Sequence, residues 1–183
     1  MLPIGQARVG DKIIRAGAPH EILTITHLNL GRGQAKVPSR LKNLLTGAII
    51  DQTFQGGERV EPAEISYRTG QFLYLEGQQG FFMLEETFEQ SQCRLAANQQ
   101  LWLKEGQSVN LTFWQDQAIT VNLPPTVQLR VEYAEPAVKG NTATDARKPA
   151  TLETGAQITV PLFIKTGQLI RVKTETGSYD SRV

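Results

Sequence analysis

The sequence contains little cysteine and histidine. Among 183 residues there is one cysteine, Cys93, and two histidines, His20 and His27. A single cysteine cannot form an intramolecular disulfide, which fits a reducing compartment. Its neighbours Gln92 and Arg94 suggest neither a nucleophile nor a ligand cluster, so we interpret Cys93 as structural. Since no cysteine or carboxylate lies at metal-ligand spacing from the histidines, we expect no metal site.

Long apolar runs are also missing. No run approaches the roughly 18 apolar residues that cross a bilayer, and the first ten residues lack the basic and apolar segments of a signal peptide. Hydrophobic residues make up 40% of the chain, which is enough for one large or two to three small domains. We therefore expect a cytoplasmic protein with no membrane partner.

Catalytic motifs are absent as well. The sequence has no Gly-x-Ser-x-Gly, no Walker loop and no Gly-x-Gly-x-x-Gly before a helix. Glu85 and Glu86 are adjacent, and adjacent side chains on a strand face opposite ways, so they make poor acid-base partners. We expect a binding protein that is not an enzyme and needs no cofactor.

Charge is distributed unevenly, although the formal net charge is only +1. Lys and Arg outnumber Asp and Glu by 8 to 6 in residues 1–64 and in 128–183, whereas residues 65–127 have 3 against 6. No carboxylate occurs between Glu21 and Asp51. Four cations lie inside that gap: Arg32, Lys36, Arg40 and Lys42. The gap indicates either a solvated basic face or a phosphate-rich partner, with equal weight.

Alternation of apolar and polar residues predicts β-strands, with two clear examples at 127–133 and 158–164. Because Pro161 cannot donate to a ladder, we expect an edge strand or a bulge there. Helix is expected only within 94–103. Further short strands are predicted at 12–15, 21–26, 72–75, 81–84, 109–114, 119–122 and 169–173. Many short strands with turns between them predict small barrels or sandwiches.

Two composition shifts suggest domain boundaries, one at 56–65 and one at 123–127, where consecutive prolines stiffen the chain. They predict three β domains over 1–64, 65–127 and 128–183.

Four aromatic residues could stack on nucleic-acid bases, but their place in apolar strands favours core packing. These aromatic residues are Phe81, Phe82, Trp102 and Trp114.

Two loops are candidate contact sites. In "LNLGRGQA" (28–35), Arg32 lies between Gly31 and Gly33, either as the solvated apex of a tight turn or as a tip that reaches a partner. The loop "GNTATDARKPAT" (140–151) is either a surface linker or a site for phosphate and ribose oxygens. Its candidate ligands are Thr142, Thr144, Arg147 and Lys148.

Specific strings carry a family resemblance over nearly the whole chain. They are "GDKIIRAGAPHEI" and "GRGQAKVPSRLKNLLTGAIIDQTFQGGERVE" near the start, "LYLEGQQGFFMLEETFEQ" in the middle and "EPAVKGNTATDARKPATLETGAQITVPLFIKTGQLIRVKTETGSYDSRV" at the end. With these strings the chain resembles the bacterial translation elongation factor P family.

This resemblance implies an all-β fold of three small barrels, an SH3-like or KOW-like first domain followed by two OB-fold domains, in an elongated L shape like a tRNA. It implies a cytoplasmic, monomeric factor that binds the ribosome beside the peptidyl-tRNA. There it would stimulate peptide bond formation at consecutive-proline stalls. Two alternatives stay open: a paralogue that relieves other stalls, and a free-standing OB-fold protein that binds single-stranded nucleic acid.

The resemblance also implies roles for individual residues. The functional tip is Arg32, supported by Gly31 and Gly33. Arginine-type relatives are glycosylated with rhamnose at this position, so an enzyme that modifies Arg32 is one alternative. Many other relatives have lysine at the tip. An unmodified arginine is the second alternative, because "LGRGQA" looks more like the loops of those lysine-containing relatives than like the arginine-containing ones. The expected contacts with tRNA or other RNA are Lys36, Arg40, Lys42, Asn141, Thr142, Thr144, Arg147 and Lys148. Asn141 replaces the acidic residue usual in the family.

Overall fold

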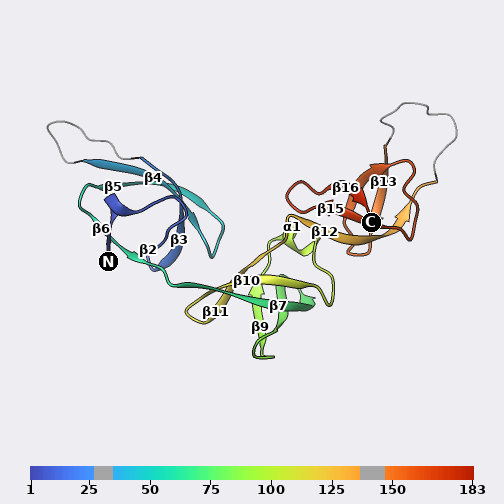
Figure 1. The fold of residues 1–183 in the computed structure, drawn as a ribbon, viewed down its shortest axis with the longest axis horizontal. Coiled ribbons are helices and arrows are strands. Elements are labelled where there is room, and N and C mark those ends of the chain that lie inside the picture. Colours follow the sequence, from blue (N-terminus) through green and yellow to red (C-terminus); the bar gives the residue numbers. More distant parts are fainter. Residues whose placement is uncertain (27–34, 137–146) are drawn as a thin grey trace. The chain divides into compact units, whose positions relative to one another are not determined.

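The computed structural model describes residues 1–26, 35–136 and 147–183, and strands dominate this part of the chain (Figure 1). Within these ranges, helix is limited to the 3-10 turn η1 (Ile4–Gln6) and the single turn α1 (Ala97–Gln100). The all-β class predicted from the alternating pattern is confirmed, and α1 lies inside the one segment expected to be helical.

The first sheet contains six strands in the order β1-β6-β2-β3-β4-β5. Their bounds are β1 Leu2–Pro3, β2 Lys12–Arg15, β3 Ala18–Ile25, β4 Lys36–Asn43, β5 Ile49–Gln55 and β6 Arg59–Pro62. Fully buried side chains of Ile13, Ile22, Leu41 and Phe54 fill its core. Within residues 56–65, where a domain boundary is predicted, β6 pairs with β1 and β2.

The second sheet contains five strands in the order β11-β10-β7-β8-β9. Their bounds are β7 Ile65–Glu76, β8 Gln79–Leu84, β9 Gln90–Arg94, β10 Ser108–Trp114 and β11 Gln117–Asn122. The buried residues on these strands include Phe72, Phe82, Leu111 and Phe113. The predicted core role of Phe82 is confirmed, whereas Phe81 is only half-buried.

The third sheet contains five strands in the order β14-β13-β12-β15-β16. Their bounds are β12 Thr126–Ala134, β13 Arg147–Leu152, β14 Gln157–Pro161, β15 Leu169–Lys173 and β16 Ser178–Arg182. Pro161 ends β14, an edge strand, which confirms its expected position. An edge tolerates a residue without an N–H donor. The strand therefore ends at Pro161 and does not extend to Ile164.

By the packing of the backbone, the chain divides into two compact units, one of residues 1–68 with 111–120 and the other of 69–110 with 121–183. In the second unit Trp102 is 6% exposed and packs into the core of the third sheet. A Cβ added to Gly177 would lie 3.2 Å from Cζ2 of Trp102, so this glycine leaves room for the indole. The division into 1–64, 65–127 and 128–183 stays a prediction.

Candidate functional site

The outer face of β4 carries three of the predicted RNA contacts. Lys36, Arg40 and Lys42 are exposed and are the first, fifth and seventh residues of the strand, whereas Val37 and Leu41 are buried. Because side chains alternate along a strand, all three cationic side chains project from the same face of the sheet. We call this surface, defined by Lys36, Arg40 and Lys42, the β4 cationic face.

Nearby carboxylates neutralise only part of the positive charge of the β4 cationic face. Arg40 lies opposite Asp51 of β5, with 3.3 Å between Nε and Oδ1, but both side chains are more than half exposed. Such exposed pairs are weak because water screens them. Glu21 lies opposite Lys42, yet its carboxylate pairs with Lys12 at 3.5 Å. Within the described residues, therefore, Lys36 and Lys42 have no ion-pair partner.

The start of β4 is held tightly against the end of β5. The backbone N–H of Gly56 donates to the carbonyl oxygen of Ala35 at 2.5 Å, and a Cβ on Gly56 would lie 2.7 Å from the Cβ of Ala35. This close approach requires glycine. Sequence reasoning missed Gly56, although its place in a Gly-Gly pair was an available signal. Gly31, Arg32 and Gly33 precede Ala35 in the sequence and lie outside the described residues.

The second group of predicted contacts belongs to the other compact unit. Arg147 is exposed at the start of β13, but Lys148 is 7% exposed, and its Nζ donates to the carbonyl oxygen of Glu135 at 2.5 Å. This bond gives Lys148 a structural partner within the domain. Its predicted contact with RNA stays a prediction, as does that of Arg147. Asn141, Thr142 and Thr144 lie outside the described residues.

Family models match these sheets one after another. The model described as "Elongation factor P (EF-P) KOW-like domain" matches residues 4–60, and the model described as "Elongation factor P (EF-P) OB domain" matches residues 65–121. The third is "Elongation factor P, C-terminal" over 127–182. The chain belongs to the elongation factor P family. The fold class expected from the resemblance, a KOW-like domain followed by OB-fold domains, is thereby confirmed.

Curated relatives agree with this membership in the elongation factor P family. Elongation factor P of Symbiobacterium thermophilum is 43% identical over 184 residues, and that of Microcystis aeruginosa is 41% identical, each covering 100% of both chains. Among solved structures, eukaryotic translation initiation factor 5A from Methanococcus jannaschii covers 66% of this chain and 90% of its own, with a TM-score of 0.57 and 20% identity. That likeness shows a shared fold alone. The family is one of translation elongation factors.

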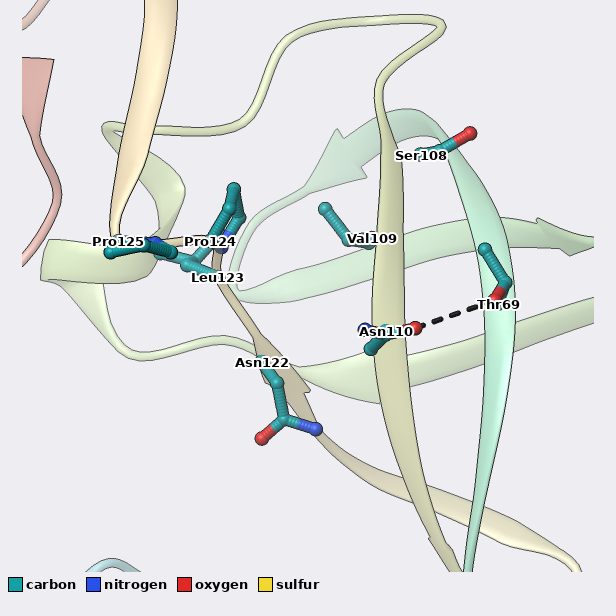
Figure 2. Close-up of a pocket in the computed structure, with 8 residues that line it drawn as sticks. All are labelled: Thr69, Ser108, Val109, Asn110, Asn122, Leu123, Pro124 and Pro125. Atoms are coloured by element: carbon teal, nitrogen blue, oxygen red, sulfur yellow. Dashed lines mark hydrogen bonds between the residues drawn. The ribbon is translucent and has the colours of Figure 1, made fainter.

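One open cavity of about 480 Å³ lies in the second unit of this elongation factor P family member (Figure 2). Figure 2 shows the hydrogen bond inside it, where the Thr69 hydroxyl donates to Oδ1 of Asn110 at 3.3 Å. Ser108 also lines the cavity and donates to Glu85 at 2.6 Å. The lining residues are Thr69, Ser108, Val109, Asn110, Asn122, Leu123, Pro124 and Pro125. None of these eight side chains is an acid or a base, so the lining offers no pair for proton transfer.

Cys93, expected from the sequence to be structural, is buried. Burial raises the pKa of the Cys93 thiol to about 11, which keeps it protonated and unreactive at neutral pH. His20 is 4% exposed, with Nδ1 at 3.0 Å from the carbonyl oxygen of Ala18. His27 lies outside the described residues. In the described ranges no group of three or more metal-ligating side chains occurs, and no helix is long and apolar enough to cross a membrane.

Proposed function

We propose that this chain binds the ribosome beside the peptidyl-tRNA and stimulates peptide bond formation when translation stalls at consecutive prolines. The observation that carries the proposal is the β4 cationic face, where Lys36 and Lys42 have no ion-pair partner within the described residues. This face begins four residues after Arg32 in the sequence. Membership in the elongation factor P family supports the same task.

In this proposal Arg32 acts by position. Its guanidinium is charged at every physiological pH and offers planar donors to phosphates and base edges. Gly31 and Gly33 let the backbone approach RNA closely. Proline aligns poorly as a peptidyl donor and acceptor, so a protein that holds the tRNA end still contributes through orientation. In this proposal no residue of the chain needs to act as a general acid or base, because the ribosome is the catalyst.

The other candidate residues would fix the position of the factor. Lys36 and Lys42 neutralise RNA phosphates directly, and Arg40 does so once its exposed pair with Asp51 opens. A second contact comes from the first residues of β13 and from residues between β12 and β13 in the sequence. These residues are Asn141, Thr142, Thr144, Arg147 and Lys148. We further propose that the factor acts in the cytoplasm as a monomer, and that Arg32 is a candidate for modification by a dedicated enzyme.

The test is translation of a reporter with three consecutive prolines in the source organism, beside a proline-free reporter. We compare the intact gene, a deletion, Arg32→Ala and the matched control Arg59→Ala, which removes an exposed arginine of β6. The deletion and Arg32→Ala should both reduce only the proline reporter, while Arg59→Ala leaves both unchanged. Unchanged output after deletion would overturn the proposal and favour a paralogue that serves other stalls. The mass of the tip peptide then decides whether Arg32 is modified.

A further inference from the structure

A β-bulge divides four aromatic side chains of the second sheet between its two faces. Phe72 of β7 lies opposite Phe82 of β8, but Tyr74 lies opposite Phe81, so Leu73 is an extra residue on β7. In a regular strand Phe72 and Tyr74 would share a face. The extra residue turns Tyr74 to the other side, which is how bulges redirect side chains.

The two aromatic pairs have different surroundings. Phe72 and Phe82 are 6% and 0% exposed, with ring centroids 5.4 Å apart and planes tilted by 59°. Tyr74 is 49% exposed and stacks on the half-buried Phe81, with 4.5 Å between ring centroids and 18° between planes. The bulge therefore creates a near-parallel aromatic stack on the solvent side of the sheet.

Amide side chains of β9 border this stack. Gln92 lies opposite Phe81, and the Nε2 atom of Gln90 donates to the Tyr74 hydroxyl at 3.4 Å. We call Tyr74, Phe81, Gln90 and Gln92 the aromatic platform. Arg94 follows on the same face of β9, where its Nε and Nη2 donate to Oε1 of Gln78 at 2.9 and 2.6 Å.

We propose that the aromatic platform binds unpaired bases of single-stranded RNA. Every base has a flat face that can continue a stack on Tyr74, and glutamine amides match the donors and acceptors of base edges. Phe81, Gln90 and Gln92 lie on β8 and β9, the second and third strands of this OB-fold domain, and Tyr74 reaches them from β7. In OB folds the face of the second and third strands generally binds oligonucleotides. Arg94 supplies a cation for the adjoining phosphate.

The composition of the platform favours RNA over a protein partner. A protein anchor is normally enclosed by apolar contacts that exclude water, whereas Tyr74 and Phe81 are bordered by polar amides. The carboxylates Glu85, Glu86 and Glu89 belong to the turn between β8 and β9, outside the platform strands. Because their negative charge repels RNA phosphates, binding should be weak, and a moderate salt concentration that screens this repulsion suits the measurement.

The experiment uses the purified full chain and a fluorescein-labelled RNA of ten adenosines, with an abasic strand of equal length as the control for phosphate binding. Tyr74→Ala should weaken binding of the adenosine strand by about 5- to 150-fold, the range for loss of one base stack. Tyr74→Phe should stay within about twofold of the intact chain, because it keeps the ring. Tyr67→Ala, which removes another exposed tyrosine of β7, should change nothing.

Three results would overturn the proposal: equal affinity for the abasic strand, an unchanged affinity in Tyr74→Ala, or the same loss in Tyr67→Ala. If Tyr74→Ala fails to fold, Gln92→Ala takes its place, with a loss of adenosine-strand affinity expected and no change counting against the platform. Loss of ribosome binding by Tyr74→Ala without any binding to free RNA would assign the face to a protein partner. The assay needs neither Arg32 nor a stalled ribosome, so its failure is distinct from failure of the proposed function.

Discussion

The β4 cationic face and the aromatic platform are both outer faces of antiparallel strands, yet they present opposite chemistry. On β4, Lys36, Arg40 and Lys42 lie on the exposed side, and the buried residues Val37, Ser39 and Leu41 alternate with that side in an unbroken period of two. On β7 a bulge interrupts the period, and Tyr74 stacks on Phe81 of β8 on the outer side. One face suits the phosphates of RNA, and the other suits its bases.

The difference shows that exposure has two origins in this fold. Lys36 and Lys42 are outside because lysine is costly to bury and the alternation leaves them there. Tyr74 is outside because one extra backbone residue reverses the side on which it would otherwise lie. The first face follows from residue type and spacing, and the second from strand register.

The largest expected effect is on stability, which should fall much more when the buried aromatic pair loses a ring than when the exposed pair does. Phe82→Ala removes a fully buried ring and should lower the free energy of unfolding by about 3–5 kcal/mol. The matched change Tyr74→Ala should cost only about 0.5–1.5 kcal/mol, because it removes a half-exposed stack. Urea denaturation followed by tryptophan fluorescence measures both. Equal losses would mean that Tyr74 is part of the core.

A smaller effect is expected when the β4 cationic face is neutralised. Lys36→Ala and Lys42→Ala should leave stability within about 0.5 kcal/mol while each lowers the salt dependence of ribosome binding by about one unit of logarithmic slope. Asp51→Asn should strengthen binding, because it frees Arg40. Filter binding over a series of salt concentrations measures the slope. Lys173→Ala, an exposed lysine of β15, is the control, and an equal change there would contradict the assignment.

The smallest effect tests the inner side of β9, directly behind the platform. Burial raises the pKa of the Cys93 thiol from 9.0 to about 11, so at pH 8 only about 0.1% is thiolate when folded, against about 10% when unfolded. An aromatic disulfide reagent should therefore react roughly 100-fold faster in urea than with the native chain. The pKa of Cys93 is higher in the folded chain than in the unfolded chain. The stability that comes from burying the neutral thiol is therefore complete below pH 9 and is lost as pH rises toward 11. Equal rates would place Cys93 on the outer side.

Much of the β4 cationic face could be predicted from the sequence. The carboxylate gap between Glu21 and Asp51 indicated local positive charge, and β4 places three of its four cations together. The pairing of Arg40 with Asp51 could not be predicted, because register between strands depends on turns and packing. Lys148 shows the same limit: a residue type that normally lies in solvent is buried here against the carbonyl oxygen of Glu135.

The sequence alone determined the all-β class, the family, the place of Arg32 between two glycines and the cations around it. These depend on residue types at fixed spacings, which the chain carries before it folds. Only the tertiary structure decided that Tyr74 faces outward onto Phe81, that Trp102 enters the core of the third sheet, and that Gly56 lies against Ala35. Each of these brings together groups that local periodicity does not relate, because register, bulges and close backbone approach arise when distant segments pack.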